Sequence, residues 1–256
     1  MSESAIYSPS RALGKRIKRR LTPLQNRRVA KFKLERPIVS FTFDDCPVSA
    51  LKHGVKPLDD LGYKSTIYIA AGLLGITNHL GLHMDAKQVI AAHEDGHEIG
   101  GHSYSHNDLS ELSLNAAQAD LARDRKVIAD LGLPASPTFA YPYGQTTPQL
   151  KYELETQYIG MRGIRPGIMH EQADLNQIRS TPLFDGAPFE TAIAQIKSLS
   201  SRPGWLTLFT HDIQQTPTPW GCTPAQMNVA ITTAISAGAL ILPVAAAIDK
   251  IQEKSS

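Results

Sequence analysis

The chain has 256 residues, of which 42% are hydrophobic and 20% charged, a composition that indicates a globular protein with a sizeable core and excludes a disordered chain. Its longest apolar stretch, residues 239–248, includes Pro243 and falls short of the roughly 20 residues that cross a bilayer. The net charge of +2 divides into +9 over residues 1–37 and −7 over the rest, so a basic N-terminal segment precedes a mildly acidic body.

Residues 1–36 are predicted to form a basic arm ahead of a single domain at residues 37–256. Such an arm can lie on an anionic membrane, or it can pack on the domain or on a second copy of the chain, and both alternatives stay open. No recognisable reader motif follows the arm, so nucleic acid is not expected as a partner. Apolar side chains recur in the arm at helical spacing among lysines and arginines: Leu13, Ile17, Leu21 and Leu24.

From residue 37 onward, strand-like and helix-like segments alternate. Asp85 and Ser113 are good N-caps for two of the predicted helices. Strands are predicted at residues 37–44, 63–70, 97–102, 138–142, 158–164, 178–184, 205–210 and 239–244. Helices are predicted at residues 49–61, 85–93, 114–131, 148–157, 189–199 and 224–237, with a short closing helix. This alternation predicts a parallel α/β domain, and seven or eight strands favour a barrel over an open sheet.

Polar side chains follow several of these strands directly. Asp44 and Asp45 end the first strand, His102 ends the third with His106 close behind, and His211 follows the strand at 205–210. In a parallel α/β barrel, reactive residues lie at the carboxyl ends of the strands. We therefore expect these side chains to meet at one edge of the sheet.

The residue types in this group indicate a catalytic metal site. Neighbouring side chains of an extended segment point to opposite faces, so one carboxylate of Asp44-Asp45 can bind an ion while the other faces a substrate. One carboxylate and two imidazoles leave coordination positions open for water and substrate. The same ligand set also serves non-haem iron enzymes, so the metal stays open at this point.

Four segments carry a resemblance to a known family: residues 40–47 (SFTFDDCP), 102–106 (HSYSH), 139–144 (FAYPYG) and 208–212 (LFTHD). In this order they are similar to the motifs of the polysaccharide deacetylases, the NodB-homology domains of carbohydrate esterase family 4. The resemblance runs from about residue 37 to the C-terminus and implies a distorted (β/α)7 barrel. It also implies removal of acetyl groups from glycans with a divalent metal, zinc foremost, with cobalt, manganese or iron as alternatives.

The resemblance assigns a role to each position. Asp45, His102 and His106 would be the metal ligands, Asp44 the catalytic base and His211 the catalytic acid. The backbone N–H of Tyr143 would stabilise the oxyanion, after a metal-bound water has attacked the acetamide. Substrate contacts are expected from the following side chains: Tyr141, Pro142, Tyr143, Phe209 and Trp220.

Two positions depart from the family pattern. Many members have an arginine where this chain has Ala140, and that arginine orients the catalytic base. Arg165, at the end of the fifth strand, is our first candidate for its replacement, and Arg179 is the second. Cys46 stands where many relatives have glycine, and its thiol either approaches the metal or fills a small apolar space.

The surroundings of His211 leave further alternatives open. Its acidic partner is expected to be Asp174 or Asp185. The loop at residues 213–224 follows His211 and is expected to lie over the site, where Trp220 either stacks on a sugar ring or packs the loop down. Phe209 serves either as a wall for the acetyl methyl group or as a core residue.

The predicted activity is therefore hydrolytic deacetylation of N-acetylhexosamine units in a bacterial exopolysaccharide, of the holdfast or biofilm type, or in its lipid-linked precursor. Two cysteines cannot form a disulfide framework, and we see no signal peptide. We therefore expect the protein in the cytoplasm, either free or at the inner face of the cytoplasmic membrane. Its oligomeric state stays open. The alternatives are hydrolysis of a small amide or cyclic imide on the same fold, and a glycan-binding module without turnover.

Overall fold

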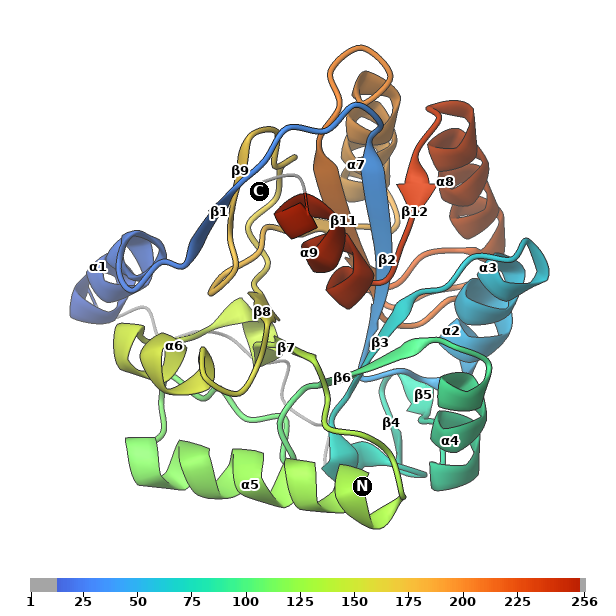
Figure 1. Cartoon of the computed structure of the whole chain (residues 1–256). Coiled ribbons are helices and arrows are strands. Elements are labelled where there is room, and N and C mark those ends of the chain that lie inside the picture. Colours follow the sequence, from blue (N-terminus) through green and yellow to red (C-terminus); the bar gives the residue numbers. More distant parts are fainter. Residues whose placement is uncertain (1–12, 254–256) are drawn as a thin grey trace.

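The computed structural model describes residues 13–253 and consists of a curled parallel sheet with helices packed outside it (Figure 1). Every pairing within the sheet is parallel. Its strand order is β10-β11-β2-β3-β6-β7-β8, with β12 also paired to β2. The strands are β2 (Ile38–Asp44), β3 (Thr66–Ile69), β6 (Glu98–Gly101), β7 (Thr138–Ala140), β8 (Gly160–Arg162), β10 (Thr181–Pro182), β11 (Trp205–Thr210) and β12 (Leu240–Ile241).

A single bridge closes this sheet into a distorted barrel. Arg162 of β8 pairs in parallel with Ile178, and the chain then leads directly into β10. The backbone N–H of Gly163 donates to the carbonyl of Ile178, which strengthens the closure. The predicted α/β barrel is therefore confirmed, with strands that are mostly shorter than the sequence indicates.

Helices cover the outer side of the barrel. Two of them begin with reciprocal side-chain caps, Asp85 with Gln88 and Thr223 with Gln226. The α-helices are α1 (Leu13–Leu21), α2 (Val48–Ala50), α3 (Lys56–Asp60), α4 (Ala86–Glu94), α5 (Leu114–Asp130), α6 (Pro148–Leu154), α7 (Ala187–Ser198), α8 (Pro224–Ser236) and α9 (Val244–Glu253). A π-helical stretch, Leu51–Val55, joins α2 to α3.

The core follows from this layering. β2 is buried along its whole length because α-helices, the neighbouring strands and the barrel interior cover both of its faces. A second cluster lies beneath the arm and includes Phe32, Leu34 and Trp205. A third lies under α5 and α6 and includes Phe139 and Tyr141. Within the described residues, no helix is long and apolar enough to cross a membrane.

Two small sheets were not predicted. β4 (Thr77–Asn78) and β5 (Gly81–Leu82) form a hairpin in what the sequence indicates as a loop. β1 (Val29–Lys31), from the arm, pairs antiparallel with β9 (Gln172–Asp174). Both pairings join short polar segments, which carry little hydrophobic periodicity.

The second half of the basic arm is attached firmly to the domain. The guanidinium of Arg28 donates to three carbonyls at the end of α6 and just before β8. The ammonium of Lys151, whose side chain is fully buried, donates to the carbonyls of Gln25 and Thr22 at 2.8 and 3.4 Å. Leu13, Leu21 and Leu24 stay exposed. Residues 1–12 of the predicted arm lie outside the described residues.

Candidate active site

The residues predicted to carry the chemistry meet at the carboxyl edge of the barrel. Asp44 is the last residue of β2, and Arg162 is the last residue of β8. His102 follows β6 directly, and His211 follows β11 directly. Parallel strands bring these ends to the same edge, so residues far apart in sequence become neighbours.

Asp45, His102 and His106 form a cluster that can hold a metal ion. One ligand atom from each residue lies within 4.8 Å of the other two. Asp45 Oδ1 is 3.2 Å from His106 Nε2 and 3.6 Å from His102 Nε2. Two ligands at about 2.1 Å from a tetrahedral zinc lie about 3.4 Å apart, so these separations suit such an ion.

The electrostatics of the cluster also fit a cation. Burial by itself raises the pKa of the Asp45 carboxyl, but the nearby imidazoles of His106 and His102 outweigh it and lower this pKa to about 2. Burial, aided by His106, lowers the pKa of His102 to about 4. At neutral pH the cluster therefore presents a carboxylate and a neutral imidazole from His102, the forms that bind metals. Asp45 Oδ1 is buried and accepts no hydrogen bond from any described residue.

Surrounding groups orient the two histidines. His102 Nδ1 lies 2.7 Å from the carbonyl of Ala140, so this nitrogen donates its proton there and Nε2 faces the cluster. Asp120 on α5 accepts hydrogen bonds from the backbone N–H groups of Tyr104 and Ser105, between the histidines. Asp120 was not predicted, because an acidic side chain on one side of a helix is its only signal in the sequence.

Left-handed backbone conformations concentrate at this edge. Five of the six described non-glycine residues with positive φ belong to it, namely Asp45, Cys46, Ser103, His106 and Tyr143. Such conformations are costly for residues with a Cβ atom and persist where the surroundings impose them. The left-handed conformation of Asp45, where φ is 56°, turns the backbone between the two aspartates. The side chains of Asp44 and Asp45 therefore have different partners, as predicted, but the cause is this turn and not the alternation of side chains along a strand.

The partner of Asp44 is Arg162, which corrects the expectation of Arg165. Arg162 Nη2 donates to Asp44 Oδ2, and both side chains are buried. Arg165 and Arg179 line a separate pocket outside the barrel. Arg165 was expected because it follows the predicted strand at residues 158–164, whereas Arg162 lies within that strand, where charged side chains are unusual.

Arg162 compensates for the alanine at position 140 by its register. Ala140 of β7 and Arg162 of β8 are paired residues in neighbouring parallel strands. The guanidinium of Arg162 therefore reaches Asp44 from the next strand, at the same level in the barrel. It lies over the rings of Tyr68 and Phe209, 5.1 and 4.9 Å from their centres, which fixes its direction.

His211 has a backbone partner in place of the expected carboxylate. Its ring nitrogen Nδ1 lies 3.1 Å from the carbonyl oxygen of Trp220, and the backbone N–H of His211 donates to the same oxygen. Neither predicted acid takes that position: Asp174 contacts Lys151, and Asp185 accepts from Gln226. A carbonyl acceptor fixes the ring as a carboxylate would, leaving Nε2 available.

The loop that supplies this carbonyl is organised by Asp212. This fully buried carboxylate accepts hydrogen bonds from the backbone N–H and the hydroxyl of Thr218, at 2.8 and 2.5 Å, and from Gln214. Trp220 contacts the ring of His79 from the β4–β5 hairpin, with ring centres 5.6 Å apart. The two loops thus meet beside His211, an arrangement that no sequence pattern indicated.

The remaining predicted substrate contacts divide into two groups. The Tyr143 ring lies against His106, with ring centres 4.7 Å apart, and so borders the cluster. Phe209 lies between Arg162 and His211 with only 6% of its surface exposed. Tyr141 is a core residue, because it is 1% exposed and its hydroxyl donates to the carbonyl of Asn176, so the expected side-chain contact with substrate is wrong. Pro142 is also buried.

Cys46 and His83 complete the surroundings of Asp45. Cys46 is fully buried within the main core cluster, and burial together with the charges of Asp45 and Asp44 raises the pKa of its thiol. Its left-handed φ of 46° explains why glycine suits this position in relatives. His83 was not predicted: its Nδ1 bonds the carbonyl of Ile76, while Nε2 is buried without a hydrogen-bond partner in the described part of the chain.

Comparisons with known proteins identify the family of this chain. A family model described as polysaccharide deacetylase matches residues 31–162. A chitin deacetylase of Arthroderma benhamiae is 29% identical over 191 residues, covering 70% of this chain and 44% of that protein. The chain thus spans less than half the length of this relative.

Two solved structures share the fold. The family 4 acetyl xylan esterase from Clostridium thermocellum, in complex with cobalt, aligns with a TM-score of 0.59 and 23% identity over 82% of this chain and 89% of its own. The family 4 carbohydrate esterase from Streptomyces lividans, in complex with acetate, has a TM-score of 0.58 and 18% identity over 80% and 91%. At this identity, the likeness concerns the fold.

Proposed function

Because the chain belongs to the polysaccharide deacetylase family, we propose that it hydrolyses N-acetyl groups of a glycan, releasing acetate and leaving a free amine on the sugar. The observation that carries this proposal is the arrangement around Asp44 and Asp45. One aspartate lies in an Asp-His-His cluster, while its neighbour is paired with a buried arginine beside that cluster. These are the parts that hydrolysis of an unreactive amide requires.

Asp45, His102 and His106 would hold a divalent metal, and zinc is our proposal for its identity. When bound, such an ion polarises an acetyl oxygen and makes water more acidic. Three protein ligands leave coordination positions open, as in catalytic rather than structural sites. The hydrogen bond of His102 Nδ1 to Ala140 keeps the other ring nitrogen directed at the cluster.

Asp44 would act as the general base. Its Oδ2 accepts from Arg162, while Oδ1 is buried and has no hydrogen-bond partner among the described residues. Oδ1 is thus the oxygen that can take a proton from the attacking water. Arg162 would hold the carboxylate in its orientation, the task that the family gives to an arginine at the position of Ala140.

Protonation of the leaving amine falls to His211. Its Nδ1 is fixed by the Trp220 carbonyl, so Nε2 can carry the proton to the sugar nitrogen. The backbone N–H of Tyr143 is proposed to stabilise the oxyanion, because this residue forms a left-handed turn and its ring lies against His106. Removal of one such donor typically costs a factor of about 10²–10³ in rate.

We further propose that the substrate is an N-acetylhexosamine unit of a bacterial exopolysaccharide or its lipid-linked precursor, processed at the inner face of the cytoplasmic membrane. The arm supports this membrane contact because the exposed Leu13 and Leu21 lie on the same helix as Lys18 and Arg20. Deletion of residues 1–21 should release the protein from anionic liposomes. Equal retention of both forms would contradict the membrane contact.

The activity is tested by mass spectrometry of acetate release from N-acetylated chito-oligomers and O-acetylated xylo-oligomers, with zinc supplied or removed by a chelator. We expect zinc-dependent loss of N-acetyl groups. Asp44→Asn should abolish turnover, whereas Asp130→Asn, an exposed acid on α5, should retain it. Absence of acetate release by the zinc-loaded protein, or undiminished turnover by Asp44→Asn, would contradict the proposal.

A further inference from the structure

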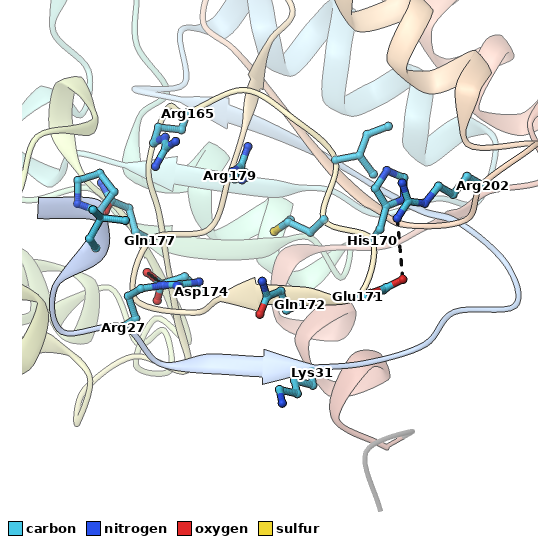
Figure 2. A pocket seen from close by; sticks show the side chains of 14 residues that line it. Arg27, Lys31, Arg165, His170, Glu171, Gln172, Asp174, Gln177, Arg179 and Arg202 are labelled. Atoms are coloured by element: carbon cyan, nitrogen blue, oxygen red, sulfur yellow. Dashed lines mark ion pairs between the residues drawn. The ribbon is translucent and has the colours of Figure 1, made fainter. Parts of the chain in front are cut away.

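A pocket of about 800 Å³ lies between the arm and the outer surface of the barrel. Its walls come from the end of the arm, the segment around β9, and the loop before β11. Figure 2 shows its charged side chains on several sides of one hollow. This volume is in the range of pockets that bind small molecules. Neither Asp45 nor its histidine neighbours line it, so the pocket is separate from the deacetylase site.

The pocket is strongly basic. Among the described residues that line it, only Glu171 and Asp174 have carboxylates. Its cationic side chains are more than twice as many and come from four separate segments of the chain: Arg27, Lys31, Arg165, Arg179 and Arg202. Cations brought together from distant segments repel one another unless an anion lies between them. The body of the chain is net acidic, so the concentration of arginines here is local.

The two carboxylates do not neutralise this charge. Asp174 already accepts from Lys151 and from the backbone N–H groups of Arg28 and Asn176, and its contact with Arg27 is longer, at 3.7 Å. Glu171 is 82% exposed and lies 3.8 Å from Arg202, the pair drawn with a dashed line in Figure 2. Exposed pairs of this kind contribute little.

Arg165 and Arg179 are the centre of the argument. Neither forms an ion pair with a carboxylate of the described chain, and Figure 2 shows both on the same side of the pocket. Arg179 Nη1 donates to the carbonyl of Pro166 at 3.1 Å. A Cβ atom at Gly167 would lie 2.9 Å from that nitrogen, so the glycine makes room for the guanidinium. The guanidinium of Arg179 is therefore positioned before any ligand arrives.

We propose that this pocket binds a phosphoryl group, carried by a soluble phosphate ester or diphosphate or by a phospholipid headgroup. Guanidinium groups pair with phosphate oxygens through two parallel hydrogen bonds, and several such groups match a ligand with more than one negative charge. The side-chain amides of Gln172 and Gln177 line the same pocket and add neutral donors. The proposal is independent of the deacetylation reaction.

The test is calorimetric titration of the metal-loaded protein with pyrophosphate, beside the double variant Arg165→Gln/Arg179→Gln. Each lost charged hydrogen bond should weaken binding about tenfold. The matched control is Lys52→Gln/Lys87→Gln, which removes two exposed lysines elsewhere and should leave binding unchanged. His102→Ala, which disrupts the metal cluster, should also bind pyrophosphate normally. Loss of binding in that variant would assign the ligand to the metal site and overturn the proposal.

A second arm distinguishes the two sources of the phosphoryl group. Vesicles of phosphatidylglycerol and of phosphatidylcholine are sedimented with the same variants. If pyrophosphate binds and the double variant loses it, the pocket takes a soluble phosphate; if only phosphatidylglycerol vesicles bind and the double variant loses them, it takes a headgroup. Equal binding by the double variant and the wild type in both assays overturns the proposal. Hexuronate oligomers, which carry carboxylates in place of phosphoryl groups, are titrated in the same way. If the protein binds them but does not bind pyrophosphate, the proposal is also overturned.

Discussion

Replacement of Arg162 by methionine tests how Asp44, the proposed general base, is held in place. Its side chain is fully buried and that of Asp44 is 5% exposed, so the substitution leaves a buried carboxylate with no cation beside it. Breaking a buried ion pair from one side typically costs about 3–5 kcal/mol. We expect this loss in the free energy of unfolding, together with loss of deacetylation, because Asp44 is no longer oriented.

The double variant Asp44→Asn/Arg162→Met separates the ion pair from packing. It removes both charges, so it should recover more than half of the stability that Arg162→Met loses. The free energy of unfolding of each variant is measured by urea denaturation, and values are compared where its dependence on urea concentration is the same. Arg165→Met, at an exposed position, should change stability by no more than about 0.5 kcal/mol. Equal losses in Arg162→Met and Arg165→Met, or no recovery in the double variant, would refute the pairing.

Three further predictions concern the metal, pH and the rim of the site. His102→Ala should lose tightly bound metal in elemental analysis, and a chelator that lowers the Tm of the wild type should then have no effect; a normal metal content would refute the ligand assignment. Burial raises the pKa of Asp124 to about 7, against the hydrogen bond from the Ala71 N–H, so the folded state keeps a proton that the unfolded state loses near pH 4. Between about pH 4 and 7 the wild type should therefore lose about 1.4 kcal/mol of stability per pH unit relative to Asp124→Asn, and parallel pH profiles in urea denaturation would contradict this. Trp220→Ala should raise KM for chito-oligomers about tenfold with kcat little changed, if the exposed part of the indole stacks on sugar, whereas a fall in kcat alone would assign Trp220 only to orienting His211.

The barrel and the metal cluster could be read from the sequence because each depends on local order. A polar residue directly after an apolar strand lies at the carboxyl edge, and this rule alone brings Asp45, His102 and His211 together. Strand β11 has the bounds predicted for it. These features need only periodicity and the direction of the strands.

The partners of these residues could not be read in this way, because they depend on register and on backbone groups. Arg162 meets Asp44 only through the pairing of β7 with β8, and the orienting acceptor for His211 is a carbonyl, which has no residue type. Tyr141 stands in a motif between strand and turn, yet its ring enters the core. A motif therefore indicated position but not side-chain direction.

The attachment of the arm has a consequence for dissecting the protein. A fragment beginning at Pro37 would lose the buried Phe32 and Leu34, whose burial is worth roughly 3–6 kcal/mol together. It would also leave the Lys151 ammonium without two of its three acceptors. Removal of residues 1–36 should therefore destabilise the domain, so the position where the motifs begin is a poor place to divide the polypeptide.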